Sequence, residues 1–164
     1  LAGCSIEDST GRDDGPIYCV EHAAARVEAA AEAAHAGEGG FVLTARAENI
    51  LHGNDDLDDT IARLQVYEAA GADVLYAPGL TRIEDIRRVV ESVGLPVNVL
   101  ARPRAPSVAE LAEAGVRRIS VGGAFAFAAL GAVVEAAREL LDDGTYGFSE
   151  RSRAGAKAAR AAFG

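Results

Sequence analysis

The residues best suited to chemistry lie at the end of one apolar run in the first third of the chain. Residues 41–45 are mostly apolar or β-branched, which predicts a buried strand, and Arg46 and Glu48 follow directly. Parallel α/β folds keep their chemistry at the carboxyl ends of strands. An arginine there can bind a carboxylate or phosphoryl group through two hydrogen bonds, and the glutamate can orient it or balance its charge. Arg46 and Glu48 are therefore candidate catalytic residues; the alternative is an ion pair that only fixes a loop.

The composition limits the class of partner. The chain has 164 residues, 49% hydrophobic and 25% charged, which suits one globular domain with a sizeable core. A formal net charge of −9 and the lack of a long basic run argue against nucleic acid or an anionic membrane as a partner. No uninterrupted apolar run of about 18 residues and no targeting segment is visible, so we expect a cytoplasmic protein. Cys4 and Cys19 are too few for a disulfide framework or a zinc site.

The elements that must position Arg46 and Glu48 alternate regularly along the chain. Strands are predicted at 2–6, 41–45, 73–77, 96–100 and 118–121, and helices at 20–36, 57–70, 83–93, 108–114 and 124–141. Each strand is a short continuous apolar run, which predicts a parallel sheet covered on both faces. A doubly wound sheet fits this pattern. Part of a (β/α)₈ barrel also fits, with about five of its eight units.

Helix signals refine this assignment. Thr81 to Glu84 and Ser107 to Glu110 both have the Ser/Thr-x-x-Glu form of a capping box and predict helix starts. The helix at 124–141 carries apolar residues on more than one face, so it is either an ordinary barrel helix or one covered by a partner subunit. The tail at 149–164 has four basic residues among alanines and is typical of a solvated helix.

Five short segments together resemble one enzyme superfamily. They are Ile6-Glu7-Asp8, Thr44-Ala45-Arg46-Ala47-Glu48, Gly71-Ala72-Asp73, Pro96-Val97-Asn98-Val99-Leu100 and Val121-Gly122-Gly123-Ala124. Their order and spacing resemble the isocitrate lyase and phosphoenolpyruvate mutase superfamily, most closely its phosphonomutase-like branch. The resemblance implies a partial (β/α)₈ TIM barrel comprising about strands four to eight, with C-terminal helices. Residues 1–148 would form the barrel part and 149–164 a helical tail.

The resemblance also implies a magnesium site and a small anionic substrate, such as a 2-oxo acid, an enolate or a phosphonate. Glu7 corresponds to an acidic residue that holds Mg²⁺ through its water shell, and Asp8 adjoins it as a weaker candidate. Arg46 corresponds to the arginine that binds substrate oxygens, and Glu48 to its acidic neighbour. The loop after Asp8 corresponds to a gate that closes over the substrate; its candidate residues are Thr10, Gly11 and Arg12.

Three further residues are candidates for substrate binding. Asn98 lies inside an apolar strand, where a buried amide needs partners, so a substrate contact and a structural hydrogen bond are equally reasonable expectations. Gly122 and Gly123 precede a predicted helix and could present backbone amides to an anion, although a tight turn is the simpler interpretation.

The departures from the superfamily limit the activity that can be expected. The loop from Gly11 to Pro16 lacks the cysteine that acts as an acid in the lyases of the superfamily. The Lys-x-Asn gate motif of the mutases is also missing. The Asp-x-Asp metal motif of the first three strands has no counterpart here. Because the chain begins with Leu1 and enters an apolar segment at once, we expect a fragment; a processed chain or a misassigned start is the alternative.

The sequence therefore predicts a Mg²⁺-dependent C–C bond lyase or hydrolase that acts on a small 2-oxo or dicarboxylic acid through an enolate-like intermediate. A C–P bond phosphonomutase and a truncated, non-catalytic barrel fragment are the alternatives. The resemblance further implies a homo-oligomer, for which it suggests a tetramer with exchanged C-terminal helices.

Overall fold

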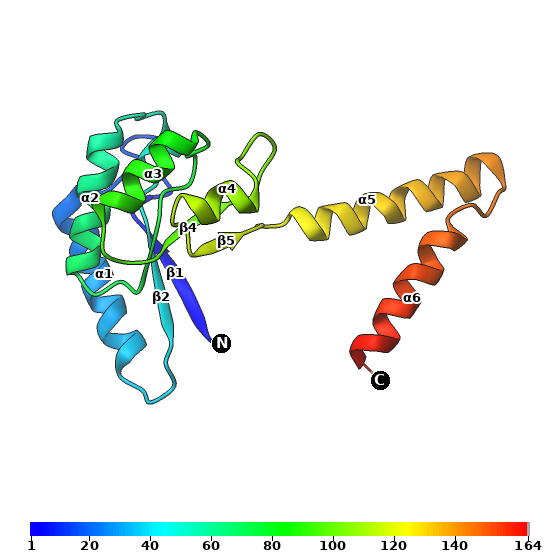
Figure 1. Ribbon diagram of the computed structural model, residues 1–164, viewed down its shortest axis with the longest axis horizontal. Coiled ribbons are helices and arrows are strands. Elements are labelled where there is room, and N and C mark those ends of the chain that lie inside the picture. The colour runs from blue at the N-terminus through cyan, green and yellow to red at the C-terminus, as the bar shows by residue number, and fades with distance from the viewer. Residues whose placement is uncertain (164) are drawn as a thin grey trace. The chain divides into compact units, whose positions relative to one another are not determined.

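The computed structural model describes residues 1–163 and contains a five-stranded sheet with helices between the strands (Figure 1). The strands are β1 (Gly3–Glu7), β2 (Val42–Arg46), β3 (Val74–Tyr76), β4 (Val97–Leu100) and β5 (Arg118–Ser120). The α-helices are α1 (Val20–His35), α2 (Leu57–Ala69), α3 (Ile83–Ser92), α4 (Val108–Glu113), α5 (Ala124–Arg138) and α6 (Ser149–Phe163), with a short 3₁₀ helix η1 (Asn49–His52) and a π-helix η2 (Glu139–Asp143). The chain divides into two compact units, Leu1–Ser120 and Val121–Gly164.

The strand order distinguishes between the two folds that the sequence allowed. All strand pairs are parallel, and the order in the sheet is the order in the chain, β1-β2-β3-β4-β5. A doubly wound sheet reverses direction at a switch point, whereas a barrel adds each new strand on the same side. The first unit is therefore part of a (β/α)₈ barrel, as predicted.

Alternation along the strands separates a helix-facing side from the opposite side of the sheet. Leu43 and Ala45 of β2 and Leu75 of β3 are fully buried in a cluster with α1 and α2. Val99 of β4 belongs to a second cluster, which lies against α3 and α4. Since successive residues of a strand point to opposite faces, the residues between them face the barrel interior.

The two predicted capping boxes have different outcomes. Ser107 forms its box: its hydroxyl accepts from the Glu110 backbone N–H at 3.3 Å, and the Glu110 carboxylate accepts from the Ser107 N–H at 2.7 Å. The box at Thr81 is wrong, because α3 begins one residue later, with Arg82 as its N-cap and no side-chain cap. Glu84 lies 3.8 Å from the Arg82 guanidinium instead of reaching back to residue 81.

The second unit consists of helices with no buried residue. The helix predicted at 124–141 is α5 and ends at Arg138, where the chain continues as the π-helix η2 up to Gly144, which has a φ of 64°. The predicted tail helix is α6, which is exposed along its length; residue 164 lies outside the described part of the chain. Within residues 1–163, none of the helices combines the length and apolar character that a membrane crossing needs.

The contrast between the capping boxes can be tested by two matched substitutions. Ser107→Ala removes a side-chain acceptor that the first turn of α4 uses, and we expect it to lower the free energy of unfolding by about 1 kcal/mol. Thr81→Ala removes no cap, and we expect a change within about 0.5 kcal/mol. Urea unfolding followed by circular dichroism measures both, and equal losses would mean that Thr81 caps α3 in solution.

Candidate functional site

The ends of β1 and β2 bring together three of the predicted site residues. The guanidinium of Arg46 donates from Nε to Glu48 Oε1 at 2.7 Å, and its Nη1 lies 3.3 Å from Glu7 Oε2. The same guanidinium lies over the ring of Tyr76, 5.2 Å from its centroid. Arg46 is thus held between two carboxylates on one side of the sheet and supported by an aromatic face.

The electrostatics of this cluster favour a cation. One guanidinium between two carboxylates has a formal charge of −1 when both carboxylates are ionised. Glu48 is only 5% exposed, and burial raises its pKa above the ordinary value against the opposing effect of Arg46. Glu7 has a half-exposed carboxylate and is the member best placed to meet water or a hydrated ion.

A row of polar residues crosses the whole sheet. In register, Glu7 pairs with Arg46, Arg46 with Tyr76, Tyr76 with Asn98 and Asn98 with Arg118. One residue from each strand therefore lies on the interior face. The row is oblique to the strand ends, because Glu7, Arg46 and Tyr76 end their strands whereas Arg118 begins β5.

The side chain of Asn98 forms hydrogen bonds with Arg118 of the same row and with Ser120. Its side chain belongs to a residue that is 1% exposed; the oxygen accepts from Arg118 Nη1 at 3.0 Å, and the nitrogen donates to the hydroxyl of Ser120 at 3.0 Å. Both ends of the amide thus have protein partners, which is the structural alternative that the sequence left open. A substrate contact by Asn98 stays a prediction.

Asp8 is buried beneath the cluster and is the acceptor of three side-chain or backbone donors. Its Oδ1 accepts from the Glu48 backbone N–H at 2.8 Å, and its Oδ2 accepts from the Tyr67 hydroxyl at 2.6 Å and from Arg63 at 3.2 Å. Burial, together with the Asp8 carboxylate, raises the pKa of the Tyr67 hydroxyl, which therefore keeps its proton. These donors occupy most of the Asp8 lone pairs, and its weak metal role stays a prediction.

The predicted gate is a compact loop with its own hydrogen bonds. Ser9 and Ile17 form an antiparallel bridge at its base. Within it, the hydroxyl of Thr10 donates to the Gly15 carbonyl at 2.7 Å, and Arg12 pairs with Asp14 at 2.9 Å. Gly11 has a φ of 71°, a conformation that glycine adopts without strain. Thr10, Gly11 and Arg12 thus lie in one exposed loop directly after Asp8, where the sequence placed them.

Gly122 and Gly123 lie at the start of the second unit. The Ala124 N–H donates to the Val121 carbonyl at 3.1 Å, so the two glycines are the central residues of a turn, and Gly122 has a φ of 53°. Gly123 is the N-cap of α5. The tight turn that the sequence offered as the simpler interpretation is present, and anion binding by these amides stays a prediction.

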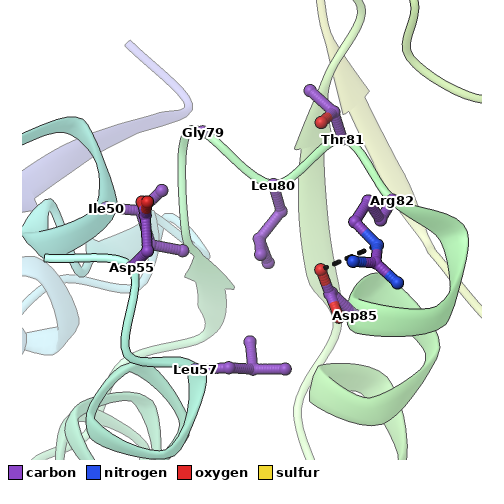
Figure 2. A pocket seen from close by; sticks show the side chains of 8 residues that line it. All are labelled: Ile50, Asp55, Leu57, Gly79, Leu80, Thr81, Arg82 and Asp85. Carbon is purple, nitrogen blue, oxygen red and sulfur yellow. Dashed lines mark ion pairs between the residues drawn. The ribbon is translucent and has the colours of Figure 1, made fainter. Parts of the chain in front are cut away.

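A separate pocket of about 380 Å³ lies beside η1 and the loop that leads into α3 (Figure 2). Its lining residues are Ile50, Asp55, Leu57, Gly79, Leu80, Thr81, Arg82 and Asp85. The Arg82 and Asp85 side chains form an ion pair at 3.7 Å across one wall. Arg46 and Glu48 do not line this pocket, so it is distinct from the carboxylate–arginine cluster.

The described side chains offer no complete set of metal ligands. Among residues 1–163, no three His, Cys, Asp or Glu side chains are close enough together to hold a metal ion directly. Binding of Mg²⁺ by Glu7 through water, with Asp8 as the weaker candidate, therefore stays a prediction.

Sequence reasoning missed three residues that the structure adds to this region. Arg63 and Tyr67 reach Asp8 from α2, and Arg118 holds Asn98 from β5. The i,i+4 spacing of Arg63 and Tyr67 on one helix face was visible, but nothing local indicated that the face meets Asp8. For Arg118, the available signal was its position in the strand predicted to follow the strand of Asn98, because residues of neighbouring strands can pair across a sheet.

Comparison with known proteins identifies the family. Residues 1–141 match the family model described as "Phosphoenolpyruvate phosphomutase". The chain is 30% identical over 146 residues to oxaloacetate decarboxylase from Pseudomonas paraeruginosa, covering 85% of this chain and 49% of that protein. It is 54% identical to a protein from Burkholderia cenocepacia J2315 assigned as a lyase or mutase, with a TM-score of 0.85 over 91% of this chain and 54% of that one.

A third relative was crystallised with ligands. Phosphonopyruvate hydrolase in complex with oxalate and Mg²⁺ is 25% identical, with a TM-score of 0.73 over 98% of this chain and 61% of that chain. The chain thus spans about half the length of the curated relatives that it matches. Its homologues are enzymes, and the chain belongs to the phosphoenolpyruvate phosphomutase family of the phosphoenolpyruvate mutase and isocitrate lyase superfamily.

Proposed function

We propose that this chain forms the C-terminal half of a Mg²⁺-dependent lyase or hydrolase that cleaves a C–C bond in a small 2-oxo or dicarboxylic acid. The observation that carries the proposal is the Glu7–Arg46–Glu48 cluster at the carboxyl ends of adjacent strands. It combines a fork-shaped anion binder with a net negative charge that favours a divalent cation. An enolate-like substrate anion is the species that such a pair of sites would stabilise.

The donor set supports magnesium as the cofactor. Glu7 offers an exposed carboxylate oxygen to a hydrated ion, and Asp8 lies next to it in the chain. Oxygen ligands and retained waters are what Mg²⁺ prefers, and the related phosphonopyruvate hydrolase was crystallised with this ion. When bound, the ion would supply positive charge next to the anion that develops on the substrate.

Substrate binding, proton exchange and exclusion of water would fall to different residues of this chain. Glu48 holds Arg46 from one side at 2.5–2.7 Å, whereas the contact with Glu7 is longer, at 3.3 Å. A substrate carboxylate can therefore replace Glu7 at Nη1 while Glu48 keeps the guanidinium in place. Burial raises the pKa of Glu48 above its ordinary value, so we assign proton exchange with the substrate to this carboxylate. The loop with Thr10, Gly11 and Arg12 would close over the site and exclude water.

Two alternatives have support of their own. A C–P bond phosphonomutase is favoured by the family model that matches, although the Lys-x-Asn gate motif is absent from the chain. A non-catalytic barrel fragment stays the second alternative, and the chain spans about half the length of each relative. Substrate contacts by Asn98, Gly122 and Gly123 belong to the same proposal and distinguish none of these activities.

The exposed apolar side chains of α5 support a homo-oligomer, for which we propose a tetramer. Phe125 and Phe127 are more than 70% exposed, and Leu130 and Val133 more than 55%. Several large exposed apolar side chains on one helix are typical of a subunit interface. A cytoplasmic location is a separate expectation from the sequence.

Titration calorimetry of Mg²⁺ with oxalate, an enolate mimic, tests the proposed site. We expect binding to the chain, or to a version extended upstream, and a loss of about tenfold to a hundredfold in affinity on Arg46→Ala, because a charged, forked donor is removed. Arg46→Lys keeps the charge without the fork and should recover only part of the affinity.

The control is Arg88→Ala, which removes an exposed arginine that pairs with Asp58. Binding by the 164-residue chain would show that the site is largely complete within it. Binding only by the extended form would assign the function to the whole barrel, and binding by neither form would contradict the proposal.

The burial of Glu48 predicts a pH dependence with a definite sign. Its pKa is raised above 4.5 in the folded state, so the folded chain holds this proton to a higher pH than the unfolded chain. Relative to Glu48→Gln, the wild-type free energy of unfolding should be highest below pH 4.5 and fall as the pH rises through the folded pKa of Glu48. Urea unfolding at a series of pH values measures this difference.

Asp73 provides a control of opposite sign. Burial raises the pKa of Asp73, but the hydrogen bonds from the Leu43 N–H at 2.7 Å and to His35 at 3.0 Å lower it by more than burial raises it. The net direction of the pKa is therefore downward. The stability that Asp73 contributes relative to Asp73→Asn should be present above pH 3.8 and be lost as the pH falls. Equal slopes for the two pairs of variants would refute the assignment of Glu48.

The oligomer is tested by the double substitution Phe125→Asp and Phe127→Asp. Two charges at these exposed apolar positions of α5 should reduce the molar mass measured by light scattering to that of a smaller species. Ala158→Asp on the exposed helix α6 serves as the control, and an unchanged mass for the double variant would exclude Phe125 and Phe127 from the interface.

A further inference from the structure

Arg63 of α2 contacts both ends of the gate loop. Its Nη1 lies 3.2 Å from Asp8 Oδ2 and donates to the backbone carbonyl of Tyr18 at 3.1 Å. Asp8 and Tyr18 flank the loop, and they are also joined directly, since the Tyr18 N–H donates to the Asp8 carbonyl at 2.9 Å. We call Asp8 and Tyr18 the gate stem. One guanidinium thus ties together the two residues where the loop leaves and rejoins the fold.

The carboxylate held by Arg63 also fixes the backbone of Glu48. Asp8 Oδ1 accepts from the Glu48 N–H at 2.8 Å while Oδ2 is held by Arg63 and by the Tyr67 hydroxyl. The Glu48 side chain in turn holds Arg46. A continuous set of contacts therefore runs from α2 through Asp8 to Glu48 and the guanidinium that is proposed to bind substrate.

The burial of this set makes it stiff. Asp8 is 2% exposed, and the side chain of Arg63 is 13% exposed and is fixed at Nε by Asp59 at 3.1 Å. A buried carboxylate that loses its cation or a donor has no water to replace it, so Asp8 keeps these partners in one arrangement. Because Asp8 is itself part of the gate stem, a movement of the stem also displaces the hydrogen bond between Asp8 and the Glu48 N–H.

We propose that Arg63 is a positioning residue that couples the gate loop, residues 9–17, to the orientation of Glu48 and Arg46. The inference rests on the proposed function for the identity of the site, but not for the coupling itself. The hydrogen bonds of Arg63 go to Asp8, Tyr18 and Asp59 and not to Glu48 or Arg46, so it acts through Asp8. Tyr67 shares the carboxylate but makes no bond to Tyr18, so it supports Glu48 without tying the gate stem.

Amide hydrogen exchange measured by NMR tests the coupling without any ligand. Arg63→Gln should speed exchange of the Tyr18 and Glu48 amides by about tenfold or more, because both depend on the arrangement of Asp8. Tyr67→Phe should speed exchange at Glu48 and leave Tyr18 much less affected. Amides of Leu75 and Ile86, which bond to Pro96 and Arg82, serve as internal references, and Arg88→Gln is the matched control.

A double-mutant cycle then tests whether Arg63 acts through Glu48. In Mg²⁺–oxalate titrations, Arg63→Gln and Glu48→Gln should each weaken binding, and the double variant should lose less than the two effects combined. Additive losses, or exchange that speeds up equally at the Leu75 and Ile86 references, would overturn the proposal and leave Arg63 a purely structural residue. If wild type binds no Mg²⁺–oxalate, the proposed function fails, and the exchange result alone decides the coupling.

Discussion

One buried carboxylate determines how the site is assembled. Asp8 follows the last residue of β1, Glu7, precedes the gate loop, and binds the backbone of Glu48 and the side chains of two α2 residues. A carboxylate that is 2% exposed is tolerated only with such donors, because an unpaired buried charge is strongly destabilising. The same requirement that stabilises the fold therefore fixes the positions of Glu7, Glu48 and the loop at residues 9–17 relative to one another.

The charge balance above Asp8 is the physical basis of the proposed metal site. Arg46 is neutralised by Glu7 and Glu48, and burial makes the second of these carboxylates costly to ionise. A divalent ion near Glu7 would relieve the excess negative charge and free Nη1 of Arg46 for an anion. In the proposed site, metal binding and substrate binding would favour each other through the shared Arg46.

Much of the fold could be predicted from the sequence, because it depends on local signals. Apolar runs and helix-ending glycines located every strand, and strand-end residues such as Arg46 and Glu48 were visible at a spacing of two. The Thr81 box failed because the pattern does not determine which residue begins the helix. Arg63 and Tyr67 could not be found in this way, since they lie 55 and 59 residues from Asp8 and only the packing of α2 joins them.

The register of the sheet adds a constraint that no single motif contains. The polar row that begins at Glu7 reaches the first residue of β5 at Arg118, so it descends across the sheet from the carboxyl ends of the strands toward an amino end. Strand tilt in a barrel produces this offset. Asn98 and Arg118 therefore lie further from the carboxyl ends of the strands than Arg46 does, and they bind each other. The proposed site is thus limited to the ends of β1 and β2, which are the parts of the sheet that the contacts of Asp8 connect.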